Sequence, residues 1–126
     1  MKDRFKFRAW NKETKTMHYK AEQTYDCLDG IPLIYKSSFG DVLDDENYIV
    51  EQCTGIKDKN GKLIFEGDIV FLNGEKWRVI WSDEDCAFFF SNLKEVYHQP
   101  IFPGFYIMAD DFEVIGNVHE NPELVK

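Results

Sequence analysis

Hydrophobic and charged residues alternate with a period of two near the N-terminus, in the segment Phe5-Lys6-Phe7-Arg8-Ala9-Trp10. This alternation is typical of a half-buried β-strand. We expect its apolar side chains to face the interior, and Lys6 and Arg8 to face the solvent. A polar turn at residues 11–15 and an apolar segment at residues 17–19 predict a returning strand, so this region is expected to be a β-hairpin.

Residues 21–47 have no regular period. Glycine and proline residues interrupt this segment, and an acidic patch follows at residues 41–46. We expect an irregular region that contains a short strand near residues 33–35 and one helical turn.

From residue 48 onward, apolar and β-branched residues gather in short segments that turn-forming residues separate. The expected strands are residues 48–54, 63–65, 69–72, 76–81, 86–90 and 112–116. Gly55 is expected to end the first strand, and Asn73-Gly74 is the strongest hairpin signal in the chain. Asn121 and Pro122 predict the N-cap and first position of a C-terminal helical turn. Short strands joined by tight turns favour a small antiparallel barrel or sandwich.

These patterns divide the chain near residue 48. We expect residues 1–47 to form an N-terminal β-hairpin with an irregular region, and residues 48–126 to form a β-barrel with a short C-terminal tail. The whole chain has 126 residues, of which 44% are hydrophobic and 16% aromatic. Disordered chains are poor in aromatic residues, so this composition indicates a folded core.

Charge is unevenly distributed along the chain. The net charge is −8, which argues against a nucleic-acid binder, because such proteins usually carry a basic surface that neutralises phosphates. Residues 1–20, however, hold seven basic residues against two acidic ones, which gives this segment +5 and the remainder −13. Three interpretations of this asymmetry are open. The basic segment contacts a polyanion, or it contacts the acidic part of another copy of the chain, or the charges simply lie on the solvated faces of strands.

Cysteine and histidine residues are few and widely spaced. The three cysteines, Cys27, Cys53 and Cys86, are expected to be unpaired thiols in a reducing cytosol. No pair of cysteine or histidine residues has the spacing of metal ligands, so we expect neither a metal nor another cofactor. The sequence has no signal-peptide pattern and no apolar run near the roughly 20 residues that span a bilayer, so we expect a cytoplasmic protein without a membrane partner.

Two candidate chemical sites each have a structural alternative. Glu66 and Asp68 flank Gly67 and form a candidate carboxylate pair for acid–base catalysis, but we favour a turn in which Asp68 accepts backbone hydrogen bonds. Trp77, Trp81 and the three phenylalanines at residues 88–90 form a candidate stacking platform for bases. We favour a core role for these aromatic residues, because acidic residues follow directly and would repel phosphate.

Three blocks of residues occur in a characteristic order. The first is Lys6-Phe7-Arg8-Ala9-Trp10-Asn11, the second runs from Thr54 through Asp58-Lys59-Asn60-Gly61-Lys62 to Phe65-Glu66-Gly67-Asp68-Ile69-Val70, and the third is Glu113-Val114-Ile115-Gly116-Asn117 with Glu120-Asn121-Pro122-Glu123-Leu124. In this order the blocks resemble the YopX family of small proteins from bacteriophages and prophages of Gram-positive bacteria. The resemblance implies a mainly β fold, with a small SH3-like antiparallel barrel in the C-terminal part and a smaller N-terminal β unit. It implies no activity, cofactor or catalytic residue.

We therefore expect a phage or prophage accessory protein that is not an enzyme and acts through protein–protein contacts. The expected partners are copies of the chain itself, in a homo-oligomer, and a host or phage protein in the cytoplasm of the bacterial host. The alternative is a nucleic-acid-binding oligomer that uses the basic N-terminal segment. The candidate interaction surface comprises Phe5, Lys6, Phe7, Arg8, Trp10, Lys12 and Lys15.

Overall fold

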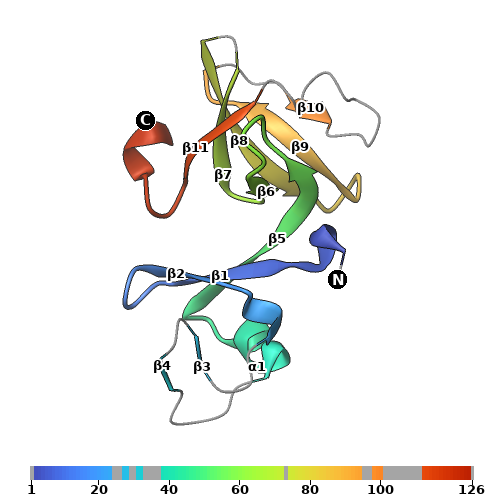
Figure 1. Cartoon of the computed structure of the whole chain (residues 1–126). Coiled ribbons are helices and arrows are strands. Elements are labelled where there is room, and N and C mark those ends of the chain that lie inside the picture. The colour runs from blue at the N-terminus through green and yellow to red at the C-terminus, as the bar shows by residue number, and fades with distance from the viewer. Residues whose placement is uncertain are drawn as a thin grey trace.

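The structure is a computed structural model that describes residues 2–23, 27–28, 31–32, 38–72, 74–94, 98–100 and 112–125. It is mainly β, as the sequence predicted, and Figure 1 shows two curved sheets one above the other. The strands are β1 (Phe7–Asn11), β2 (Thr16–Tyr19), β3 (Cys27–Leu28), β4 (Ile31–Pro32), β5 (Tyr48–Lys57), β6 (Leu63–Phe65), β7 (Asp68–Leu72), β8 (Glu75–Ser82), β9 (Ala87–Asn92), β10 (His98–Pro100) and β11 (Glu113–Asn117). The helical segments are the 3-10 turns η1 (Asp3–Phe5), η2 (Ala21–Gln23) and η3 (Pro122–Val125), and the α-helix α1 (Phe39–Asp44).

The first sheet has the strand order β2-β1-β5-β6, and all its pairs are antiparallel. β5 is its longest strand and starts at Tyr48, where we expected the chain to divide. It pairs with β1 over its first half and with β6 near its end (Figure 1). This strand therefore links the N-terminal hairpin to the C-terminal part of the chain.

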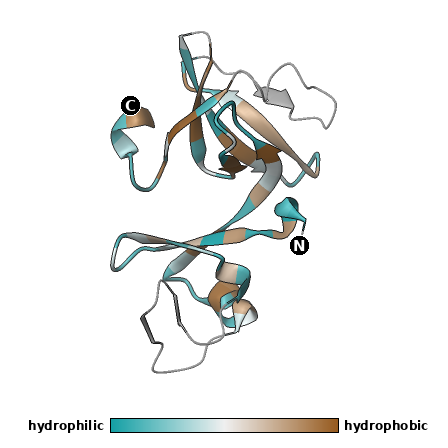
Figure 2. Ribbon diagram, viewed as in Figure 1, coloured by the Kyte–Doolittle hydropathy of each residue, from teal (hydrophilic) through white to brown (hydrophobic). Residues whose placement is uncertain are grey.

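The second sheet has the order β10-β9-β8-β7-β11. Its inner face packs with Ile64 of β6 into the larger hydrophobic core, and Figure 2 shows hydrophobic residues concentrated there. The buried members of this core are Ile64, Val70, Trp77, Val79, Phe90 and Phe112. Trp77 is thus a core residue, as we favoured, whereas the same expectation is wrong for Trp81, which is 39% exposed. The β7–β8 hairpin forms where Asn73-Gly74 predicted it. Pro100 is the last residue of β10.

A smaller core lies on the other face of the first sheet. Ala9 of β1 packs there with Ala21 of η2 and Val42 of α1, and all three side chains are buried. The hydroxyl of Ser38 accepts from the Asp41 N–H, and the Asp41 carboxylate accepts from the Ser38 N–H, so a capping box starts α1. This helix supplies the helical turn expected within residues 21–47, whereas the strand expected near residues 33–35 lies outside the described residues.

Three local predictions were wrong. Gly55 does not end its strand: it adopts φ +86°, the register shifts between Cys53 and Lys57, and β5 continues to Lys57. β1 starts at Phe7 rather than Phe5, because η1 occupies the residues before it.

The third concerns Asn121: the helical turn expected after it forms with Pro122 at the first position, but among the described residues the side chain of Asn121 is not found to cap that turn. Its Oδ1 accepts from the Asn117 N–H instead, and the turn that follows is a 3-10 helix.

Candidate functional site

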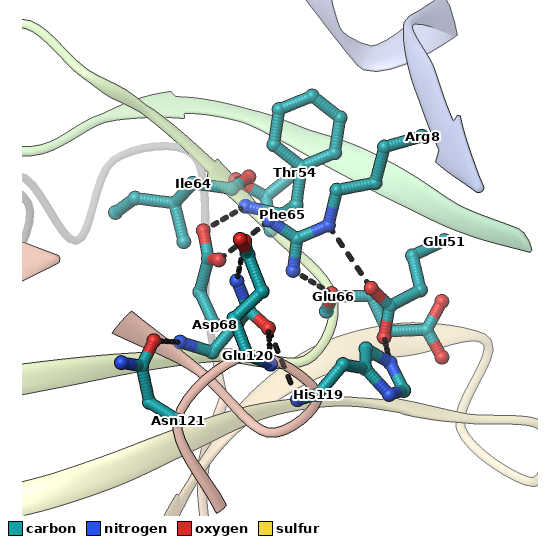
Figure 3. A network of polar contacts seen from close by, with 11 residues as sticks. Arg8, Glu51, Thr54, Ile64, Phe65, Glu66, Asp68, His119, Glu120 and Asn121 are labelled. Carbon is teal, nitrogen blue, oxygen red and sulfur yellow. Dashed lines mark hydrogen bonds and ion pairs between the residues drawn. The ribbon is translucent and has the colours of Figure 1, made fainter. Parts of the chain in front are cut away.

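Arg8 is the centre of a buried polar network between the two sheets (Figure 3). Its side chain was expected on the solvent face of β1, but only 1% of the residue is exposed. Nε donates to Glu51 Oε1 at 3.0 Å, Nη1 to Asp68 Oδ1 at 2.8 Å, and Nη2 to the Glu66 carbonyl at 3.0 Å. Each of the three guanidinium nitrogens thus donates to the protein, which commits Arg8 to holding β1, β5 and the β6–β7 turn together.

The β6–β7 turn is shaped to receive this arginine. Asp68 Oδ2 accepts from the Phe65 N–H at 2.7 Å, so the expectation that Asp68 closes this turn is confirmed. Gly67 has φ +86°, and a Cβ there would lie 2.8 Å from Cδ of Glu51, on the carboxylate that Arg8 contacts. The Gly67 N–H donates to the Val79 carbonyl, and its own carbonyl accepts from the Val118 N–H. Glycine is therefore required here by both the backbone conformation and the packing.

His119 connects the C-terminal segment to the same network. Its Nε2 lies 2.9 Å from Glu51 Oε2, and its backbone N–H donates to Asn117 Oδ1. The imidazole also stacks on Trp10 of β1, with ring centroids 5.3 Å apart and planes 17° apart. Trp10 and His119 thus give the C-terminal segment a contact with the first sheet, although it follows a strand of the second.

Arg8 and the carboxyl groups around it form the junction between the two sheets. Burial alters the pKa values of the groups in this junction. Burial raises the pKa of Asp68, and Arg8 and the Phe65 N–H offset this only in part. Burial likewise raises the pKa of Glu66, and the nearby Glu51 carboxylate raises it further. Burial disfavours the charged form of Arg8, but Asp68 and Glu51 outweigh it and raise the pKa of the guanidinium. The junction holds several carboxyl groups around one arginine, so its stability depends on pH.

Several hollows open on the described part of the surface. One pocket of about 420 Å³ lies where β1 begins, β2 ends and β6 begins, and Lys6, Phe7 and Arg8 line it. A groove of about 720 Å³ lies between η1 and the β8–β9 hairpin. A third hollow of about 630 Å³ lies beside Trp10, Lys12 and Lys15.

The seven residues of the predicted interaction surface therefore do not form one surface. Arg8 and Trp10 are buried in the network, and Phe7 is half-buried against Phe39 at 4.9 Å. Lys6 pairs with Asp3 at 2.9 Å. Phe5, Lys12 and Lys15 are exposed, but Phe5 lies on η1 and the two lysines lie on the β1–β2 turn. The continuous basic segment expected from the sequence is thus interrupted at Arg8.

The sequence reading missed Glu51, His119 and the role of Arg8. The alternation of Lys6 and Arg8 gave both residues the same outward assignment. The one available signal was the choice of arginine over lysine, since a guanidinium suits a buried site with several acceptors.

The part of the chain that the structure describes has neither a metal-binding cluster nor a membrane-spanning helix. There, no group of three or more histidine, cysteine or acidic residues could hold a metal ion. No helix in that part has the length and apolar character needed to cross a membrane. Cys53 is buried and Cys86 exposed, and both are free thiols.

Two antiparallel sheets, joined by a buried arginine and the carboxylates around it, define a small mainly β protein. The chain belongs to the YopX family: the model of the family described as YopX protein matches residues 6–126. The fold is similar to the crystal structure of protein EF1440 from Enterococcus faecalis, with a TM-score of 0.63 and 28% sequence identity. The likeness covers 96% of this chain and 97% of that one. A search of the curated proteins found no match.

Proposed function

We propose that this protein is a phage or prophage accessory protein that acts non-enzymatically, by binding other proteins and copies of itself. Membership of the YopX family supports the phage-type assignment. Arg8, Glu51 and Asp68 are buried charged residues that form ion pairs with one another. Because these groups already bind within the fold, they are not free to act on a substrate, which supports a non-enzymatic role.

The observation that carries this proposal is the groove between η1 and the β8–β9 hairpin. Arg4 lines the groove from one side, and its guanidinium lies 4.6 Å over the ring of Phe5, which is 47% exposed and follows Arg4 outside the lining of the groove. Trp81 lines the groove from the other side and is 39% exposed. Exposed aromatic side chains and arginine are enriched in protein interfaces, where they supply most of the binding energy.

Charge complementarity favours a second copy as one of the partners. Lys2 and Arg4 outnumber Asp3 on one wall of the groove and give it a net positive charge, whereas the exposed turn at residues 83–85 beside Trp81 is acidic. Opposite charges on one chain attract across subunits and lower the self-repulsion of a chain whose net charge is −8. The homo-oligomer is therefore part of the proposed function.

Light scattering of the purified chain at micromolar concentration and low salt tests this proposal. We expect a mass above that of the 14.9 kDa monomer. Phe5→Ser should weaken the assembly about tenfold or more, because it removes an apolar side chain worth about 2 kcal/mol on burial. Phe71→Ser is the matched control, since Phe71 is 41% exposed but lies on the second sheet away from η1.

The outcome that contradicts the self-association is a 14.9 kDa mass for the wild-type chain over the whole concentration range. An equal loss of assembly in the Phe5 and Phe71 variants would contradict the placement of the interface at the groove.

A further inference from the structure

The pocket at the open end of the β1–β2 hairpin combines apolar walls with a rim of lysines. Its walls include Phe7, Tyr19, Leu63 and Phe65, and its volume is about 420 Å³. This volume lies within the range of about 300–1,000 Å³ that is usual for small-molecule sites. The pocket is separate from the groove of the proposed function and shares no lining residue with it.

Aromatic contacts fix the apolar part of this pocket. The rings of Tyr19 and Phe65 meet edge to face, with centroids 5.7 Å apart. The guanidinium of Arg8 lies 5.0 Å from the centroid of Phe65 and 6.0 Å from that of Tyr19. Since its nitrogens donate to Glu51, Asp68 and the Glu66 carbonyl, Arg8 holds these rings in place rather than offering a donor to a ligand.

The cations on the rim come from three separate segments. Lys6 precedes β1, Lys20 follows β2, and Lys62 precedes β6. Neither Lys20 nor Lys62 forms an ion pair with any residue that the structure describes, whereas Lys6 pairs with Asp3. The one acidic residue that lines the pocket, Glu22, accepts from the Phe7 N–H at 2.8 Å.

This convergence of cations is unusual for so acidic a chain. The sequence has 23 acidic residues against 15 lysines and arginines. Bringing Lys20 and Lys62 to one pocket costs repulsion that an anion placed between them relieves. A ligand with only a charged group would leave the aromatic walls uncovered, and one with only an apolar body would leave Lys20 and Lys62 without an ion-pair partner among the described residues.

We infer that this pocket binds an amphipathic anion, a small molecule whose apolar body lies against Phe7, Tyr19 and Phe65 and whose anionic head lies at Lys20 and Lys62. The apolar body supplies affinity through burial, and the two lysines select the charged head over a neutral one.

Titration of the full chain by two-dimensional NMR tests the inference with three probes: octanoate, 1-octanol and acetate. Octanoate carries both features, octanol only the apolar body, and acetate only the charge. We expect octanoate to bind at least tenfold more tightly than octanol, and acetate to cause no saturable change at 10 mM. The shifted amides should belong to residues around Tyr19, Leu63 and Phe65.

A charge variant separates the two parts of the site. Lys20→Gln with Lys62→Gln should lower octanoate affinity to that of octanol and leave octanol binding unchanged. Both side chains are exposed, so the fold should persist. Lys12→Gln with Lys15→Gln is the matched control, because these exposed lysines line a different hollow, and its octanoate affinity should equal that of the wild type.

Three results would overturn the inference: no octanoate binding at 10 mM, equal affinity for octanoate and octanol, or shifts centred away from the pocket. An unchanged octanoate affinity in the Lys20 and Lys62 variant would overturn the assignment of the head group. None of these results depends on the oligomeric mass. The NMR titration therefore tests the pocket, and light scattering tests the proposed function independently.

Discussion

Arg8 Nη1 lies 2.8 Å from Oδ1 of Asp68, and the two residues are 60 positions apart in the sequence. Arg8 belongs to the first sheet and Asp68 starts a strand of the second, so this ion pair joins the two sheets. Both side chains are almost completely buried. A buried pair contributes little if both members are replaced by apolar residues, but the loss of one member leaves a charge in the interior without compensation.

Gly67→Ala should destabilise the fold more than Gly61→Ala. Both glycines have positive φ, +86° and +80°, so each substitution costs about 1 kcal/mol from the backbone alone. At Gly61 an added Cβ meets nothing within 4 Å, whereas at Gly67 it displaces the Glu51 carboxylate from Arg8 and His119. We expect a total loss of about 3 kcal/mol or more at Gly67, in the range measured when a buried pair is broken.

Urea denaturation of the two glycine variants measures the difference. Equal losses of unfolding free energy for Gly67→Ala and Gly61→Ala would show that the Glu51 carboxylate moves at no cost, which contradicts the tight packing of this junction.

The sequence was informative about the strands and turns and uninformative about the junction. The alternation in β1 and the Asn73-Gly74 hairpin are local signals; both predicted a β-hairpin where the structure has one, but the alternation assigned Arg8 to the wrong face. The partners of Arg8 lie 43 and 60 residues away, so no local period could show that this side chain is buried rather than exposed. The prediction at Gly55 was wrong for a related reason. The glycine indicated the end of a strand, but β5 pairs with β6 on both sides of Gly55, so the strand continues.

Asp58 should contribute strongly to stability, because one carboxylate closes a turn and holds β11. Oδ1 accepts from the Asn60 and Lys62 N–H groups, and Oδ2 accepts from the Val114 N–H. Asp58→Ala should cost about 3 kcal/mol, at about 1 kcal/mol for each backbone donor that loses its partner. Asp45→Ala is the control, since the exposed side chain of Asp45 accepts only the Asn47 N–H among the bonds found in the described residues.

The effect of Asp58→Ala should also depend on pH. Burial acts to raise the pKa of Asp58, but the N–H groups of Val114, Lys62 and Asn60 outweigh it and lower that pKa below 3.8. The carboxylate therefore stabilises the fold above the unfolded-state pKa, and this contribution is lost as pH falls through the folded-state value. Chemical denaturation at pH 7 and below pH 3 should show the gap between wild type and variant narrowing in acid; a constant gap would contradict the lowered pKa.

Glu66→Gln should have the opposite dependence on pH. Burial and the Glu51 carboxylate raise the pKa of Glu66 above 4.5, so the folded state holds the proton more tightly than the unfolded chain does. The contribution of Glu66 to stability is therefore greatest at low pH and is lost as pH rises through the raised pKa, because ionising Glu66 costs more in the folded state than in the unfolded one. Glutamine cannot ionise, so the variant should gain stability relative to wild type as pH rises from 4 to 7.

Thermal or urea unfolding of Glu66→Gln across this pH range provides the measurement. Glu84→Gln, at an exposed turn, controls for the loss of one negative charge. If the unfolding free energy of Glu66→Gln minus that of the wild type decreases as pH rises, the result would contradict the burial of this carboxyl group.

Nucleic acid should bind this protein poorly or not at all. Arg8 is buried and Lys6 is paired with Asp3, which leaves Lys12 and Lys15 on the β1–β2 turn as the exposed lysines of the predicted basic surface. Fluorescence anisotropy with single- and double-stranded DNA at 20 mM salt should show no saturable binding below 10 μM protein. Binding that weakens steeply between 20 and 200 mM salt would instead support the nucleic-acid alternative, because phosphate contacts release counterions.

A double-mutant cycle on Arg8 and Asp68 measures the link between the two sheets most directly. Arg8→Met alone should lower the unfolding free energy by about 3–5 kcal/mol, because it leaves Asp68 and Glu51 buried without their cation. Asp68→Asn should also destabilise, since the amide keeps an oxygen acceptor but loses the charge. The double variant should be more stable than the sum of the single losses predicts, with a coupling energy of about 2 kcal/mol between the two positions. A coupling within about 0.5 kcal/mol of zero would contradict a network in which this pair holds the sheets together.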